Sequence, residues 1–317
     1  MPFGSFVQEY LLFEIIFLGT SASAPSVHRG LSAQIISHNE YRFLVDCGEG
    51  TQRQILQSGI GFRRLSRILI THGHLDHILG LAGLLSTFLR WETIDELEIM
   101  AGRGALERIH DLLYGVVLRK NRPDMDLRLT EIKPGIVFQD DDFYINAFPV
   151  IHRGPDCLGY VFAEKSKRPF LADKAEALKI PPGPWRKDLV NGYESELPDG
   201  RIITPDEVLG VERPGARLVL SGDIGDPQSL LEITQGADML VCEATYLQEE
   251  AQMAEEFGHL TAHQAAEIAQ QTGVKQLVLT HISRRYREKD VLEEAQAVFS
   301  NTRVARDFDT FQVKRED

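Results

Sequence analysis

Short apolar runs recur along the chain, and several of them end at a side chain that is able to bind a metal ion. The runs in "EYRFLVDCGEG", "FYINAFPVIH", "ARLVLSGD" and "KQLVLTH" have the composition of buried strands, and they lead to Asp46, His152, Asp223 and His281. Open α/β sheets bind ligands at the carboxyl ends of their strands. The pattern therefore predicts an α/β protein in which these four side chains converge at one edge of a sheet system.

A denser cluster lies in "RILITHGHLDHILGL", residues 67 to 81, where three histidines and an aspartate fall within six positions. Apolar residues before it predict a strand, and those after it predict a helix. Solvated surface, or a satisfied core histidine, is the structural alternative, but burying so many ionisable groups without a cation is costly. In an extended loop His72 and His74 project to one side and reach one ion, whereas Asp76 and His77 project elsewhere, towards a second.

Two further residues extend this candidate metal site. A carboxylate has two oxygens, so Asp223 is able to bridge two ions. His259 lies just ahead of a predicted helix for which Thr261 is a candidate N-cap. We therefore regard His259 as the candidate for proton transfer.

Composition limits the class of protein. Of the 317 residues 43% are hydrophobic, enough for a sizeable core, and no apolar stretch reaches eighteen residues, which argues against a membrane span. The N-terminal "YLLFEIIFLG" is interrupted by Glu14 and is expected to form a first strand rather than a signal peptide. The three scattered cysteines, Cys47, Cys157 and Cys242, predict no disulfide framework and favour the reducing cytoplasm.

Charge is distributed unevenly along the chain. The net charge of −13 argues against non-specific binding of nucleic acid over the whole surface. Between residues 163 and 190, however, seven basic and four acidic side chains give a net charge of +3. Such a run is usually a solvated face, so by itself it indicates only a candidate binding segment.

The cluster motif is the first of several stretches that resemble a known family. "THGHLDH" resembles the HxHxDH signature of the metallo-β-lactamase superfamily, and "DCGEGTQRQ", "CEATY" and "GHLTAHQAA" resemble the ribonuclease Z family within it. The resemblance runs from about Phe13 to the C-terminus. It implies a single domain over residues 1–317 with a four-layer αβ/βα sandwich, and an endonuclease that removes the 3′ trailer from precursor tRNA and leaves a 3′ hydroxyl.

The stretch "PPGPWRKDLVNG", residues 181 to 192, is similar to the GPxxxxLxxG motif of that family. This likeness implies a flexible arm, inserted at about 164–203, that neutralises phosphates and positions tRNA without reading its bases. The residues implied to bind substrate are Gly183, Pro184, Arg186, Lys187, Leu189 and Gly192.

The family pattern also implies a role for each candidate residue. It implies two zinc ions per chain, although imidazole and carboxylate ligands do not exclude manganese or iron. The first zinc would be bound by His72, His74 and His152, and the second by Asp76, His77 and His281, with Asp223 bridging them.

The family pattern also implies which residues transfer protons, the oligomeric state of the protein and its compartment. Asp76 is implied as general base. His259, held by Glu243, is implied as the proton donor to the leaving 3′ oxygen. Asp46 is expected to orient a metal-bound histidine. The protein is expected to be a homodimer in the cytoplasm.

Two alternatives stay open on the sequence. The first is a hydrolase of the same superfamily that acts on a small phosphodiester, thioester, lactone or sulfate ester, because fold and metals do not fix the substrate. The second is an RNA-binding module that has lost its chemistry, against which the complete set of seven ligand residues argues.

Overall fold

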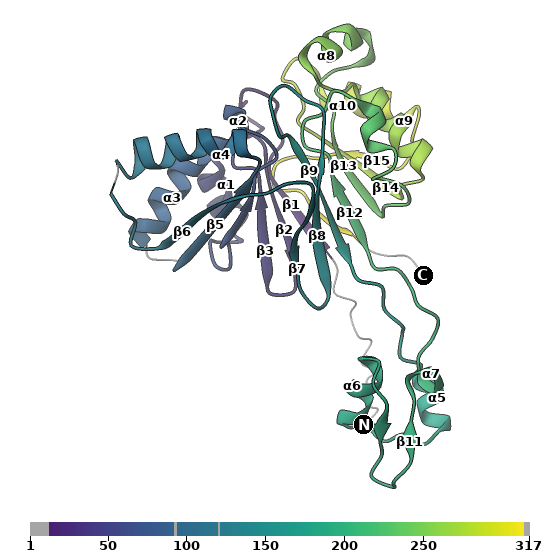
Figure 1. Cartoon of the computed structure of the whole chain (residues 1–317). Coiled ribbons are helices and arrows are strands. Elements are labelled where there is room, and N and C mark those ends of the chain that lie inside the picture. Colours follow the sequence, from purple (N-terminus) through teal and green to yellow (C-terminus); the bar gives the residue numbers. More distant parts are fainter. Residues whose placement is uncertain (1–12, 92–93, 120, 314–317) are drawn as a thin grey trace. The chain divides into compact units, whose positions relative to one another are not determined.

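The computed structural model describes residues 13–91, 94–119 and 121–313 (Figure 1). They divide into two compact units. The first unit lies within Met1–Asp140, Tyr144–Ala163 and Ala216–Asp317, and the second comprises Asp141–Phe143 and Glu164–Gly215. The arm expected at 164–203 thus falls inside a second unit that continues twelve residues further. The expected first strand begins at Phe13, and its residues 10–12 lie outside the described part.

The first unit contains two mixed β-sheets, each with seven strands among the described residues. Strands β3, β4, β5 and β6 run parallel in the first sheet, and β12 to β15 run parallel in the second. In spatial order the first sheet is β16 (Thr310–Val313), β1 (Phe13–Gly19), β2 (Ala33–His38), β3 (Tyr41–Val45), β4 (Arg67–Leu69), β5 (Glu96–Ala101) and β6 (Asp126–Glu131). The second is β15 (Thr302–Val304), β14 (Gln276–Thr280), β13 (Met239–Glu243), β12 (Arg217–Leu220), β9 (Leu158–Glu164), β8 (Phe143–Pro149) and β7 (Gly135–Gln139).

The two sheets pack against each other through aromatic side chains. The ring centroids of Phe13 on β1 and Phe43 on β3 lie 6.0 Å and 5.8 Å from that of Phe162 on β9. The hydroxyl of Tyr160, also on β9, donates to the carbonyl of Ile70 at 2.7 Å. All these rings are buried, so alternate positions of each strand face the shared interior, as the period of two requires.

Helices cover the outer face of each sheet (Figure 1). A core of Ile55, Leu84, Phe88 and their neighbours joins the first sheet to its helices, and Ala265, Ala269 and Val291 belong to the core beside the second. The first set is α1 (Thr51–Ser58), α2 (Leu75–Ile78), α3 (Gly80–Trp91), α4 (Arg103–His110) and the π-helix η1 (Asp111–Val117). The second is the 3₁₀ turns η2 (Pro227–Leu230) and η3 (Gln248–Glu250), with α8 (Ala251–Phe257), α9 (Ala262–Thr272) and α10 (Glu288–Gln296). The expected four-layer αβ/βα sandwich is confirmed.

The second unit has its own small core. It contains helices α5 (Ala172–Ala177), α6 (Pro184–Val190) and α7 (Pro205–Val208), and a hairpin of β10 (Ser195–Glu196) and β11 (Ile202–Ile203). Buried side chains such as Ala175, Leu189 and Val208 pack together there. Residues 164–215 carry nine basic and ten acidic side chains, so the positive charge expected of the arm is confined to its N-terminal part. None of the described helices in either unit is long and apolar enough to cross a membrane.

Candidate metal centre

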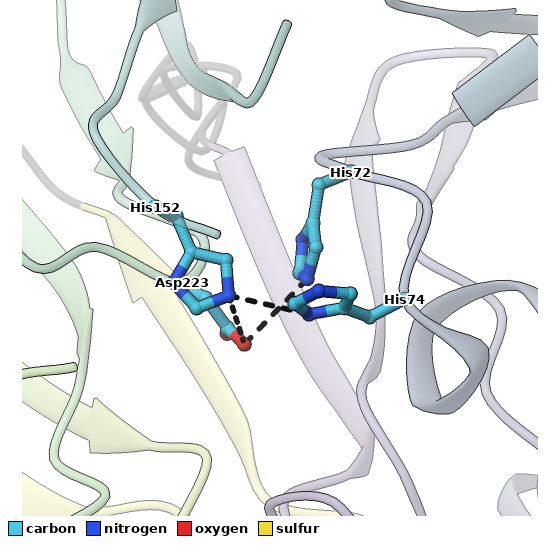
Figure 2. A group of neighbouring side chains, drawn as sticks. All are labelled: His72, His74, His152 and Asp223. Carbon is cyan, nitrogen blue, oxygen red and sulfur yellow. Dashed lines mark hydrogen bonds and ion pairs between the residues drawn. The ribbon is translucent and has the colours of Figure 1, made fainter. Parts of the chain in front are cut away.

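Loops at the ends of several strands bring the candidate ligands together in two groups. His72 and His74 come from the loop between β4 and α2, His152 from the loop after β8, and Asp223 from the loop after β12, and Figure 2 shows these four side chains pointing at one another. One ligand atom from each lies within 4.8 Å of the others. The strands end earlier than expected, because β8 stops at Pro149 and β12 at Leu220.

The second group consists of Asp76, His77 and His281, again with ligand atoms within 4.8 Å of one another. Asp76 and His77 lie in the short helix α2 rather than in the extended loop expected from the sequence. His281 follows β14 directly and has a φ of +55°, an uncommon conformation for a residue that is not glycine. Such backbone strain is often found at functional sites, and here it directs the imidazole of His281 towards α2.

Asp223 lies between the two groups. Its Oδ2 is 3.3 Å from Nε2 of His77 and of His281, 3.8 Å from Nε2 of His72, and 3.9 Å from Nε2 of His152. The side chain is buried, so its charge is poorly solvated by water. A carboxylate in this position is able to serve both groups at once.

Imidazole nitrogens without hydrogen-bond partners indicate whether these residues are able to bind a metal ion. Among the described residues, Nε2 of His72, His77 and His281 are buried without a hydrogen-bond partner, an arrangement that costs roughly 1–3 kcal/mol for each polar atom. All three face Asp223. Buried imidazole nitrogens that converge with carboxylates are the donors that zinc and similar divalent cations prefer. The centre therefore fits a divalent metal site.

Charges inside the centre shift several pKa values. Burial lowers the pKa of His72 well below its ordinary value. Burial also opposes charge on His77, but the carboxylates of Asp223 and Asp46 outweigh it and hold the His77 pKa well above the ordinary value. For Asp223, burial acts to raise the pKa, and the nearby His281 and His77 more than offset it, so the pKa stays well below its usual range. The carboxylate of Asp223 is thus ionised and able to bind a cation.

Hydrogen bonds orient the ligands from outside. Asp46 accepts from Nδ1 of His77 at 2.8 Å, and the carbonyl of Gly258 accepts from Nδ1 of His152 at 2.6 Å. Each bond places a proton on Nδ1 and turns Nε2 inward, so that Nε2 is the atom that would bind a metal ion. Asp46 itself has a φ of +59°. The backbone N–H of Ser23 donates to Oδ2 of Asp76 at 2.9 Å.

His259 and Glu243 form a buried pair beside the centre. Nδ1 of His259 lies 2.9 Å from Oε1 of Glu243, which also accepts from the backbone N–H of Ile224 at 2.8 Å. The His259 ring is 4.9 Å from that of His152 and 5.4 Å from that of His281. Burial acts to lower the pKa of His259, but the charge of Glu243 and the hydrogen bond to it prevail and raise it to about 9. His259 is therefore a protonated imidazole at neutral pH.

This pair gives the protein a pH-dependent contribution to stability. Because the pKa of His259 is raised from 6.5 to about 9, the contribution is fully present below about pH 6.5 and is lost as the pH rises through 9. It amounts to on the order of 3 kcal/mol. In metal-free protein we expect Glu243→Gln to lower the free energy of unfolding more at pH 6 than at pH 10, measured by urea denaturation. An equal loss at both values would contradict the charged pair.

The residues implied to bind substrate all lie in the second unit. Gly183 is the N-cap of α6, and a side chain there would meet the ring of Trp185 at 2.2 Å. Arg186 donates to the backbone carbonyls of Ile180 and Pro181 and lies over the ring of Phe170, 5.6 Å from its centroid.

The remaining motif residues divide between the core and the surface of the unit. Leu189 is fully buried in the core of the unit, so the expectation that it contacts substrate is wrong: it packs α6. Gly192, with a φ of +86°, allows the turn after α6. Pro184 and Lys187 are exposed.

The exposed basic residues of this unit fall into two kinds. Lys167 pairs with Asp142 at 2.6 Å, and Arg168 with Asp206 at 2.6 Å. In the described part of the chain no ion pair involves Lys174, Lys179 or Lys187, which are all exposed. These three lysines are therefore exposed positive charges that a phosphate could contact.

Two threonines, Thr71 and Thr245, were not identified from the sequence, although both contact ligand histidines. Each stands next to or within a motif that the sequence singles out, "THGHLDH" and "CEATY". Thr71 is next to His72 in the chain, but Asp46, which accepts from its hydroxyl, lies 25 residues away, and Thr245 lies 36 residues from His281. Local spacing therefore does not reveal how either hydroxyl is connected.

Known proteins share this fold and sequence. The family model described as "Anti-Pycsar protein Apyc1" matches residues 13–173, and the model described as "Beta-lactamase superfamily domain" matches residues 199–282. A ribonuclease Z of Bradyrhizobium sp. (strain ORS 278) is 45% identical over 302 residues, which cover 95% of this chain and 100% of the relative. A ribonuclease Z of Archaeoglobus fulgidus is 42% identical, covering 96% of this chain and 98% of the relative.

The crystal structure of the short form of human tRNase Z has a TM-score of 0.68 at 26% identity, covering 95% of this chain and 100% of the human one. Fold and site together define a metallo-β-lactamase-fold protein with a centre for divalent metal. Because its relatives match it over nearly their whole length, the chain belongs to the ribonuclease Z family.

Proposed function

We propose that this protein is an endoribonuclease that removes the 3′ trailer from precursor tRNA and leaves a 3′ hydroxyl on the tRNA. The observation that carries the proposal is the hydrogen-bonded pair of His259 and Glu243 beside two groups of histidine and aspartate side chains that are able to bind metal. Cleavage that leaves a 3′ hydroxyl expels a ribose 3′ oxygen, which needs a proton. The 45% identity with a ribonuclease Z, which extends over 95% of this chain, supports the same substrate.

The metal requirement of the proposal is two zinc ions per chain. His72, His74 and His152 would hold one, Asp76, His77 and His281 the other, and Asp223 would contact both. When bound, two such cations neutralise charge on the phosphodiester and make water a better nucleophile. The nitrogen-rich ligand set supports zinc, and manganese or iron are alternative outcomes of a metal analysis.

The chain's own side chains supply the proton transfers. Asp76, ionised and fixed by the Ser23 amide, accepts a proton from the attacking water. The pKa of Asp76 lies below its ordinary value, because the contacts with His281 and His77 outweigh the effect of burial. His259 bonds Glu243 through Nδ1, so Nε2 carries the proton that it gives to the leaving 3′ oxygen. Water attack and oxygen departure therefore have separate proton acceptors and donors.

The proposal includes the cellular compartment and the oligomeric state of the protein. Cys47, Cys157 and Cys242 are free and buried, which supports a reducing cytoplasm, where precursor tRNA would be met. The exposed Leu75 and Leu79 of the α2 region are apolar side chains that a homodimer would cover. Light scattering coupled to size-exclusion chromatography tests the dimer.

Cleavage of a 3′-extended precursor tRNA by the purified, zinc-loaded protein tests the function. We expect one cut next to the discriminator base, reduced by about 10²-fold or more in Asp76→Asn because a positioned base contributes 10²–10⁴-fold. Asp111→Asn, an exposed site on η1, is the matched control. An uncut precursor, with hydrolysis of a small phosphodiester retained, would favour the small-substrate hydrolase. Well below two metal equivalents per chain would favour the RNA-binding module.

A further inference from the structure

Two carboxylates hold the outer side of the metal centre, and each serves two histidines. Asp46, after β3, accepts directly from His77 at 2.8 Å. It also accepts from the hydroxyl of Thr71 at 2.9 Å, and that hydroxyl lies 3.0 Å from Nδ1 of His72. One carboxylate thus orients His77 directly and His72 through a threonine.

Glu243, at the end of β13, repeats this pattern in the other sheet. It accepts directly from His259 at 2.9 Å and from the hydroxyl of Thr245 at 2.5 Å. The Thr245 hydroxyl lies 2.9 Å from Nδ1 of His281. The second carboxylate thus orients His259 directly and His281 through a threonine, but His259 is the proposed proton donor whereas His281 is a metal ligand.

The single proton of the Thr245 hydroxyl fixes the direction of these bonds. It has two acceptors, Oε2 of Glu243 at 2.5 Å and the carbonyl of His281 at 3.2 Å, and the shorter contact to a charged oxygen takes it. The hydroxyl oxygen then accepts from Nδ1–H of His281. This tautomer leaves the lone pair on Nε2 of His281, the buried atom that has no hydrogen-bond partner among the described residues.

We propose that Thr245 is a positioning residue that couples the metal ligand His281 to the acid pair Glu243–His259, so that a single carboxylate orients both. The Thr71 hydroxyl on the opposite side orients the metal ligand His72 but, among the residues that the structure describes, is not connected to the acid pair. The acid half of this proposal rests on the proposed function, whereas the metal half does not. The side chain of Thr245 is buried, and a hydroxyl of the same reach is required.

Valine and serine substitutions separate the two halves. Thr245→Val keeps the shape and removes the hydroxyl, and Thr245→Ser keeps the hydroxyl. Thr71→Val and Thr71→Ser are the matched pair on the other side. If Thr245→Val does not fold, Thr245→Ala is used with the same expectations.

The first measurement is the affinity of each variant for zinc. The protein and a chromophoric chelator compete for zinc, and no RNA is present. We expect Thr245→Val and Thr71→Val to weaken the binding of one zinc about 10–100-fold, as for other outer-sphere changes. The serine variants should stay within about threefold. Unchanged zinc affinity in Thr245→Val, or equal weakening in Thr245→Ser, would overturn the metal half.

The second measurement compares two substrates at saturating zinc. An aryl phosphodiester has a leaving group that needs no proton, whereas precursor tRNA needs one. At saturating zinc we expect Thr245→Val to hydrolyse the aryl ester at a rate within about threefold of wild type. It should cleave precursor tRNA about 10²-fold more slowly than wild type, because the acid is misplaced. Thr71→Val should regain both. Parallel losses on the two substrates in Thr245→Val would overturn the acid half.

Failure of the proposed function has a different signature. If wild-type protein hydrolyses the aryl ester but not precursor tRNA, the proposed function falls while the zinc competition still decides the metal half. The acid half is then decided with a dialkyl phosphodiester in place of tRNA, with the same expected ratio between Thr245→Val and wild type.

Discussion

Asp223→Asn should abolish nearly all cleavage of a 3′-extended precursor tRNA, with a fall of at least about 10³-fold in kcat/KM. The physical reason is that Asp223 lies within 3.9 Å of four imidazole nitrogens drawn from both ligand groups. Asparagine keeps the shape but removes the negative charge that offsets a bound cation. Metal catalysis supplies several kcal/mol to such reactions, and about 1.4 kcal/mol corresponds to tenfold in rate.

Metal content separates this loss from a failure to fold. Atomic absorption of the Asp223→Asn variant should give less metal per chain than wild type under the same loading. Asp226→Asn is the matched control, because Asp226 lies three residues further on, caps η2, and can be replaced there by asparagine without loss of the cap. Wild-type metal content together with wild-type cleavage in Asp223→Asn would contradict the place of this residue between the two groups.

Much of the candidate site could be predicted from the sequence alone, because four candidate ligand residues lie within six positions. His72, His74, Asp76 and His77 needed no knowledge of tertiary structure. His152, Asp223 and His281 depended on the weaker inference that strand ends meet. The structure brings these three residues together with the motif, although the strands before His152 and Asp223 end about three positions earlier than expected.

The outer hydrogen bonds could not be predicted in the same way. Thr245 and His281 are 36 residues apart, and Asp46 and His77 are 31 apart. Such pairs form only because β3 pairs with β4 and β13 pairs with β14 in parallel. A threonine hydroxyl has no sequence signal of its own, since the residue is common in strands and caps alike.

The fold was predictable as a class but not in its details. Alternating apolar runs and the family motifs indicate the layers, whereas the pairing of β16 with β1 joins the two ends of the described chain and has no local signal. The change from α4 to the π-helix η1 also lies inside one apparently regular helical pattern. The second unit continues twelve residues beyond the expected end of the arm at 203, and this C-terminal part is acidic and carries none of the motifs that the sequence offers.

Removing the second unit should separate RNA cleavage from the underlying chemistry. Ala163 on β9 and Arg217 on β12 are antiparallel partners, so a short turn containing asparagine and glycine can replace residues 164–216. All seven ligand residues, Glu243 and His259 lie in the first unit. We therefore expect hydrolysis of an aryl phosphodiester to stay within about twofold of wild type, and cleavage of precursor tRNA to fall at least about 10²-fold, because phosphate contacts supply most of the affinity for nucleic acid.

A charge variant tests whether phosphate contacts are the cause. Replacing Lys174, Lys179 and Lys187 by glutamine removes the three exposed lysines of the unit that have no ion pair in the described structure. Each lost phosphate contact lowers the slope of log KM against log salt by about one, so the triple variant should lose a slope of about two to three for precursor tRNA and none for the aryl ester.

The first unit offers a triple with the same change of charge, in which glutamine replaces Lys133 and the ion-paired Lys275 and Lys289. It should leave the salt slope unchanged, because the proposal assigns RNA binding to the second unit. Equal effects of the two triples would mean that net charge, not the arm, governs binding. Cleavage of precursor tRNA that survives deletion of residues 164–216 would exclude the arm from substrate recognition, whereas loss of aryl ester hydrolysis as well would show that the arm supports the metal centre itself.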